Sequence, residues 1–160
     1  MMRVFLLSFF LSLNLIGENS IEALEETLYK FWEARNNQDF EMIFFYESKI
    51  GAITGSSSEN YFYEDPPPDL KSVVDYYSLV ESNVKPSNIK IIQLSEKVYL
   101  TLYYLTGSYK YSNGKVNTEY KTRASNIWFY EDGGFKLYYK NFTNLKKELE
   151  PTDIIAYPMD

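Results

Sequence analysis

The sequence predicts an α+β domain in which a strongly curved antiparallel sheet wraps around N-terminal helices. The last third of the 160-residue chain supplies three long β-branched and aromatic runs, 97–111, 116–130 and 135–143. Their connecting turns contain Asn113-Gly114 and Asp132-Gly133, which are typical of antiparallel hairpins. Helical spacing dominates the N-terminal half, and helices gathered before one antiparallel sheet indicate an α+β layer. The length fits one domain.

Residues 1–17 have the composition of a secretory signal peptide. Arg3 provides a short positive region, and the apolar run 4–16 is too short to span a bilayer. A buried N-terminal helix is the alternative, but a run that is apolar on all sides has no polar face for solvent. We therefore expect a secreted or periplasmic protein with no stable membrane span in the mature chain. The domain then covers 18–145, and the tail 146–160 has no predicted role.

The first part of the domain predicts two helices and a short strand. Ser20 is suited to be the N-cap of a helix whose apolar face repeats at i, i+4, i+7, i+8 and i+11: Leu24, Leu28, Phe31, Trp32 and Arg35. Asp39 is expected to cap a second, short helix, a structural role that we prefer to a catalytic one. Residues 50–55 are typical of a short strand.

The middle of the chain is less regular. Three consecutive prolines at 66–68 exclude a helix, so 61–68 is expected to be a loop, with an aromatic lid as its suggested role. Asp69 is expected to cap a helix that runs through Val84 and is ended by Pro86. Residues 87–94 then form the first of four antiparallel strands.

Composition excludes several classes of chemistry. The chain has no His and no Cys, which excludes imidazole acid-base chemistry, thiol chemistry, soft-metal sites and disulfides. We accordingly expect no metal and no cofactor. A formal net charge of −6 without a basic cluster argues against nucleic acid as a partner. Tyrosine is abundant, with 16 residues, and its phenol groups can line a cavity whose walls are otherwise apolar.

A bent sheet over a helix leaves a conical hollow, which is the default place for a ligand. Strand alternation along 122–129 places Arg123, Ser125, Ile127 and Phe129 on one face and Thr122, Ala124, Asn126 and Trp128 on the other. We expect Arg123 to face the hollow. Its guanidinium would then either grip a ligand carboxylate or be used internally, by stacking on Tyr or by an ion pair with Glu47, Glu33 or Glu119.

Four short segments resemble a known family. Residues 120–128, followed by 132–137, are similar to the SnoaL-like branch of the nuclear transport factor 2-like superfamily, and so are 31–35 with 39–41. The resemblance extends from Ile21 to about Leu145. It implies a cone-shaped cystatin-like fold with a ligand cavity, and the expected pocket positions are Phe31, Trp32, Arg123, Ser125, Ile127, Tyr139 and Asn141.

The departures from the family pattern concern its acid-base groups. The closing strand has Tyr139 and Asn141 where the family commonly has two His, and the frequent acidic position near the first strand falls on Lys49, beside Glu47. Enzymes of this family need a carboxylate or His in the cavity. The resemblance therefore implies a retained cavity but weakens the case for catalysis.

Three functions remain open on sequence grounds. The favoured one is an exported, non-catalytic domain that binds a small, partly apolar molecule, with an acidic group as one option. The second is an isomerase, dehydratase or hydrolase with Tyr139 as donor and Glu47 or Asp39 as base. The third is a homodimeric interaction module whose exposed sheet face carries Trp128, Tyr130 and Tyr138.

Overall fold

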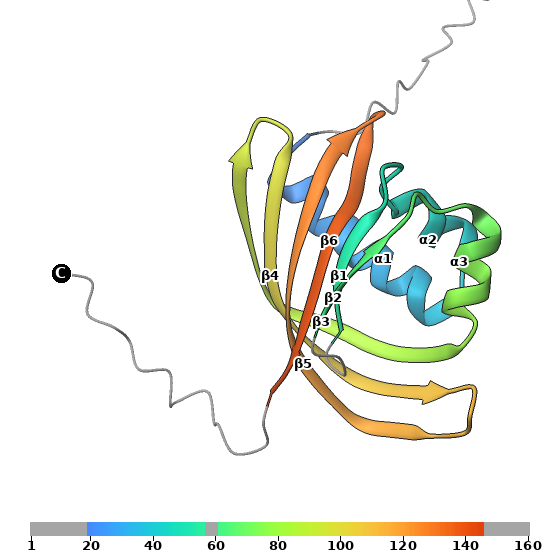
Figure 1. The fold of residues 1–160 in the computed structure, drawn as a ribbon. Coiled ribbons are helices and arrows are strands. Elements are labelled where there is room, and N and C mark those ends of the chain that lie inside the picture. Colours follow the sequence, from blue (N-terminus) through green and yellow to red (C-terminus); the bar gives the residue numbers. More distant parts are fainter. Residues whose placement is uncertain (1–18, 57–60, 146–160) are drawn as a thin grey trace, which may run out of the picture.

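The computed structural model describes residues 19–56 and 61–145, and within them three helices and six strands form the domain (Figure 1). The helices are α1 (Ile21–Asn37), α2 (Phe40–Tyr46) and α3 (Leu70–Tyr77). The strands are β1 (Ala52–Gly55), β2 (Phe62–Asp65), β3 (Val80–Ser95), β4 (Val98–Tyr111), β5 (Val116–Glu131) and β6 (Gly134–Asn144). The predicted signal peptide 1–17 and the tail 146–160 lie outside the described residues.

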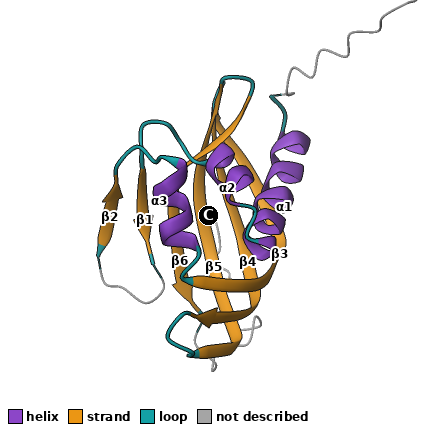
Figure 2. Cartoon of the chain, turned by 90° about the vertical axis from the view of Figure 1, so that its right-hand side faces the viewer, coloured by secondary structure: helices purple, strands orange, loops and turns teal. Residues whose placement is uncertain are grey.

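The six strands form one sheet in the order β2-β1-β6-β5-β4-β3. Neighbouring strands are antiparallel except β1 and β6, which are parallel. The helices cover one face of this sheet, and the long strands curve around them (Figure 2). This arrangement confirms the predicted α+β class and the strongly curved sheet.

The three predicted N-caps begin the three helices. Ser20 begins α1, Asp39 begins α2 and Asp69 begins α3. Each side chain accepts a hydrogen bond from the backbone N–H of the third residue after it. A short side-chain acceptor satisfies an amide that has no partner within the helix, which typically contributes about 1 kcal/mol. These helix starts are therefore local properties of the sequence.

The core lies between α1 and the inner face of the sheet. Leu24 and Leu28 of α1 are fully buried, as are Trp128 of β5 and Leu137 of β6. The indole N–H of Trp128 donates to Thr101 Oγ1 over 3.2 Å, so burial leaves no donor unpaired at this position. Because α1 contributes one apolar stripe, the sheet must curve to cover it.

Local irregularities in the long strands accompany this curvature. Gly107 in β4 has a φ of +148°, and a Cβ there would lie 2.1 Å from the carbonyl oxygen of Asn83 in β3. The register between β4 and β5 shifts next to it, between Gly107 and Tyr109. Only glycine permits this close approach of two backbones. Beyond this point the end of β4 and the start of β5 turn toward the helices (Figure 1).

Two predicted elements were wrong. The predicted helix 69–84 ends at Tyr77, and Val80–Ser95 is one long strand that continues through Pro86. Residues 80–84 are buried alternately, as a strand requires, and they pair with the end of β4. The predicted loop 61–68 contains the short edge strand β2 before its three prolines. Both segments are strands because they pair with other strands, β3 with β4 and β2 with β1.

Candidate functional site

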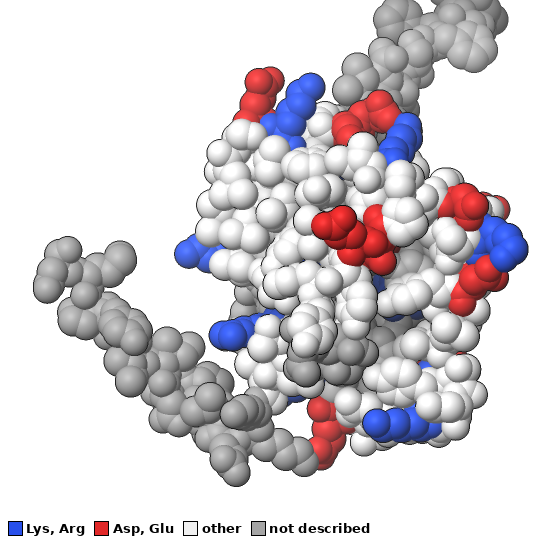
Figure 3. Space-filling view, viewed as in Figure 1, with Lys and Arg blue, Asp and Glu red and all other residues white. Residues whose placement is uncertain are grey.

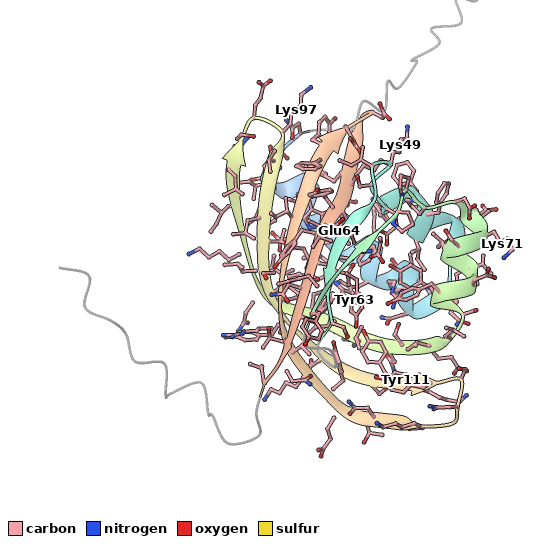
Figure 4. The ribbon with its side chains drawn as sticks, in the orientation of Figure 1. Lys49, Tyr63, Glu64, Lys71, Lys97 and Tyr111 are labelled. Carbon is pink, nitrogen blue, oxygen red and sulfur yellow. The ribbon has the colours of Figure 1, made fainter. Side chains whose placement is uncertain are left out.

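A cavity of about 750 Å³ lies between the helices and the inner face of the sheet. Its walls come from α1, α3, β2, and the ends of β4 and β5, and Figure 4 labels Tyr63 of β2 and Tyr111 of β4 among them. Nine aromatic side chains line it, with Phe31 and Trp32 on the α1 wall. A volume of this size and a largely aromatic wall suit a small organic ligand.

A buried ion pair lies in the wall of the cavity. Lys140 of β6 donates to both carboxylate oxygens of Glu47, over 3.0 and 2.9 Å. The side chains are only 10% and 6% exposed. Tyr77, the last residue of α3, donates its hydroxyl hydrogen to Glu47 Oε1 over 2.6 Å. The carboxylate thus receives three hydrogen bonds from the two residues.

The electrostatics of this cluster fix its protonation. Burial lowers the pKa of Lys140, but the adjacent oxygens of Tyr77 and Glu47 outweigh burial and hold that pKa above its ordinary value. Burial and the Glu47 carboxylate raise the pKa of Tyr77. Lys140 is therefore an ammonium and Tyr77 a neutral phenol at physiological pH. Lys140 and Tyr77 both direct their donors at the Glu47 carboxylate.

Arg35 supplies a second cation to the cavity. It lies in the last turn of α1, on the same stripe as Phe31 and Trp32. Its guanidinium stacks over the ring of Tyr77, with 3.8 Å from Cζ to the ring centroid. Nη1 is buried and makes no hydrogen bond to any residue in 19–56 or 61–145. The N–H donors of a guanidinium point outward in its own plane, so contact of its face with a ring leaves them open to an acceptor.

A β-bulge determines which residues of β6 face the cavity. Leu137 pairs with Trp128, but the next paired residues are Tyr139 and Ile127, so Tyr138 is unpaired. The extra residue reverses the alternation. Lys140 consequently faces inward, whereas Tyr139 faces outward and contacts Phe62 at 6.1 Å between ring centroids.

The expected pocket positions therefore divide into two groups. Phe31 and Trp32 line the cavity, and so does Glu47. Tyr139 and Asn141 lie on the outer face, together with Arg123, Ser125 and Ile127, which alternate with the inward-facing residues of β5. The expectation that Arg123 projects into the hollow was wrong, because the side chain is exposed on the outer face.

The inward face of β5 is the one that carries Ala124 and Trp128, not the expected one that carries Arg123. Ala124 and Trp128 are 3% and 0% exposed, so the core selects the face that carries them. Trp128 therefore cannot belong to an exposed interaction face. Glu47 pairs with Lys140 rather than with Arg123. Tyr139 and Glu47 lie on opposite faces of the sheet, and the structure does not bring this proposed catalytic pair together.

Sequence reasoning missed three residues of the site. Arg35 was recognisable as the polar end of an otherwise apolar helical stripe, which places a cation next to the core. Tyr77 lies within the predicted helix 69–84, and nothing in the sequence distinguishes it from a core aromatic. Lys140 gave no signal, because its inward direction depends on the bulge at Tyr138.

Stability should fall steeply above about pH 10, the ordinary range of tyrosine ionisation. Burial raises the pKa of Tyr77, Tyr103 and Tyr109, so the folded state keeps protons that the unfolded state loses. Each such tyrosine contributes a loss of about 1.4 kcal/mol per pH unit. Chemical denaturation between neutral and strongly alkaline pH measures the slope. Tyr109→Phe should make it shallower, and an unchanged slope would contradict this assignment.

The described part of the chain contains no helix that is long and apolar enough to cross a membrane. Within the same residues, no group of three or more His, Cys, Asp or Glu side chains converges as a metal site would require.

Solved structures share this fold. One is a nuclear transport factor 2-like protein from Cytophaga hutchinsonii, 15% identical, with a TM-score of 0.63 over 80% of this chain and 100% of that chain. Another, with a cystatin-like fold, is from Caulobacter vibrioides, 12% identical, with a TM-score of 0.60 over 86% and 95% of the two chains. A ketosteroid isomerase-like protein from Erwinia carotovora atroseptica is 13% identical, with a TM-score of 0.59 over 76% and 93%.

No family model and no curated protein matches the sequence. At these identities the likeness defines the fold alone, and that fold is the nuclear transport factor 2-like one. The resemblance predicted from the sequence is confirmed at this level. Its finer assignment to the SnoaL-like branch stays a prediction.

Proposed function

We propose that the protein binds a small, partly apolar molecule with an acidic group in the cavity, without transforming it. The observation that carries the proposal is the buried Nη1 of Arg35, which has no acceptor among the described residues. Leaving such a donor unpaired costs about 1–3 kcal/mol, which a ligand oxygen would offset. A carboxylate or sulfate can take two parallel hydrogen bonds from a guanidinium.

The remaining lining suits the apolar part of such a ligand. Phe31 and Trp32 line the cavity from the same helix as Arg35, and Tyr109, Tyr111 and Tyr120 line it from the ends of β4 and β5. Ring faces provide apolar contact and the phenol groups provide polar edges. An aromatic or alicyclic body with one acidic end fits this distribution.

The absence of catalysis in this proposal rests on Glu47. A carboxylate acts as a general base only where it can accept a proton from the ligand. Here the carboxylate already accepts hydrogen bonds from Lys140 and Tyr77. Of the other two residues suggested for catalysis, Tyr139 faces away from the cavity. Asp39 caps α2, where its carboxylate accepts a backbone N–H. An isomerase or dehydratase is the alternative, because the similar structures include a ketosteroid isomerase-like protein and putative dehydratases.

Export and dimerisation are further parts of the proposal. The composition of residues 1–17 supports export, and N-terminal sequencing of the mature protein, which should lack them, tests it. The outer sheet face carries Phe129 and Tyr138, whose rings lie 4.9 Å apart, and this aromatic surface supports a homodimer. Neither part is needed for ligand binding in the cavity.

Arg35→Gln should weaken binding of 2-naphthyl sulfate by about 10- to 100-fold, the loss expected for hydrogen bonds to a charged group. Calorimetric titration or the ligand-dependent shift of Tm measures the effect. Arg123→Gln is the matched control, because it removes the same charge from the outer face. The control should bind as the wild type does.

The neutral analogue 2-naphthol separates charge recognition from apolar binding. Wild-type protein should bind it more weakly than the sulfate, and Arg35→Gln should bind the two about equally. Equal losses in Arg35→Gln and Arg123→Gln would contradict the proposal. So would a wild-type protein that binds neither compound at millimolar concentration.

A further inference from the structure

Three charged side chains belong to the wall of the cavity: the buried Glu47 and Lys140 and the half-buried Arg35. Arg35 and Lys140 are positive and Glu47 is negative, so the wall carries a net charge of one positive unit. Glu64 and Asp65 also border the cavity, but both are exposed on β2, and acidic atoms appear at this place on the surface (Figure 3). Solvent screens those two charges far more than the buried ones.

Tyr77 joins the two parts of this wall. Its ring carries the guanidinium of Arg35 on one face, and its hydroxyl binds the Glu47 carboxylate. The head group of a ligand at Arg35 would therefore lie one tyrosine ring away from Glu47. Lys140 cannot serve as a second cation for that head group, because Glu47 accepts two of its hydrogen bonds.

We infer that Glu47 restricts the cavity to ligands with a single negative charge. It does so by neutralising Lys140 and by presenting a carboxylate beside the Arg35 site. A second charge on the ligand would be desolvated without a cation to pair with, which is strongly unfavourable. The inference rests on the proposed function and identifies Glu47 as a specificity-determining residue instead of a base.

The test compares two probes of nearly identical shape. The first, 2-naphthyl sulfate, has one negative charge, whereas 2-naphthyl phosphate has two above its second pKa of about 6. At about pH 8 the wild type should bind the sulfate more tightly than the phosphate. The wild-type affinity for the phosphate should also fall as the pH rises through about 6, while the affinity for the sulfate stays constant.

Glu47→Gln leaves Lys140 without its anion and should shift the preference toward the phosphate. The expected change in the ratio of the two dissociation constants is about tenfold, the effect of one added charge at close range. The double variant Glu47→Gln/Lys140→Met restores the net charge of the wall, so it should restore the wild-type preference. Circular dichroism establishes that each variant is folded.

Different results would contradict the role of Glu47 and the binding of a ligand at Arg35. An unchanged ratio in folded Glu47→Gln, with binding that still depends on Arg35, would overturn the inference alone. If Glu47→Gln does not fold, the wild-type pH comparison decides: tighter binding of the doubly charged phosphate would overturn it. Loss of sulfate binding from the wild type itself would overturn the proposed function, and the inference with it.

Discussion

Lys140→Met is expected to destabilise the protein by about 3–5 kcal/mol, a large part of the stability of a domain of this size. The substitution removes the ammonium but leaves the Glu47 carboxylate 6% exposed and without its cation. Tyr77 would still donate one hydrogen bond, which does not compensate for a buried unpaired charge. Urea denaturation at neutral pH, followed by circular dichroism, measures the difference.

The double variant Glu47→Gln/Lys140→Met is the control for this prediction. It removes both charges, so no unpaired charge stays buried, and replacing a whole buried ion pair is often neutral or stabilising. We expect its stability to lie within about 1 kcal/mol of the wild type. A double variant as unstable as Lys140→Met would show that packing, not the charge left unpaired, explains the loss.

The features that the sequence predicted well depend on short stretches of chain. Ser20, Asp39 and Asp69 each begin a helix because a side chain binds an amide three residues away. The hairpin turns at Gly114 and Gly133 have φ values of +82° and +77°, as their sequences require. Both kinds of signal are independent of the rest of the fold.

The orientation of the site could not be predicted in the same way. Strand alternation correctly places Arg123 and Trp128 on opposite faces of the sheet. Alternation alone does not say which of the two faces is buried. Burial of Trp128 against Phe31, at 5.9 Å between ring centroids, is a contact between residues far apart in the sequence. The bulge at Tyr138 then displaced the expected pocket residues of β6 by one position.

The sequence predicts an arginine in the cavity but not which arginine, because that depends on contacts between distant residues. An arginine in an aromatic cavity was the central functional hypothesis, and the structure places Arg35 there rather than Arg123. Spacing alone places Arg35 on the apolar stripe of its helix. Its importance follows only when α3 brings Tyr77 beneath its guanidinium.

Trp128→Ala is expected to cost about 3–5 kcal/mol of stability, because a fully buried indole leaves a cavity that the core cannot close. The change also removes the hydrogen bond to Thr101 Oγ1. Thr101 is 0% exposed, so its hydroxyl would lose a partner within the core. Thermal or urea denaturation should show a large loss of stability or an unfolded variant.

Tyr138→Ala is the matched test of the opposite face of the sheet. Tyr138 is the unpaired residue of the β6 bulge, and its ring contacts Phe129 on the outer face. Truncation should cost only about 0.2–1 kcal/mol, the usual contribution of a cross-strand aromatic pair. If instead the Tyr138 variant were the less stable of the two, the inner and outer faces of β5 would be assigned incorrectly. Because Arg123 is placed by the same alternation as Trp128, that result would also return Arg123 to the cavity.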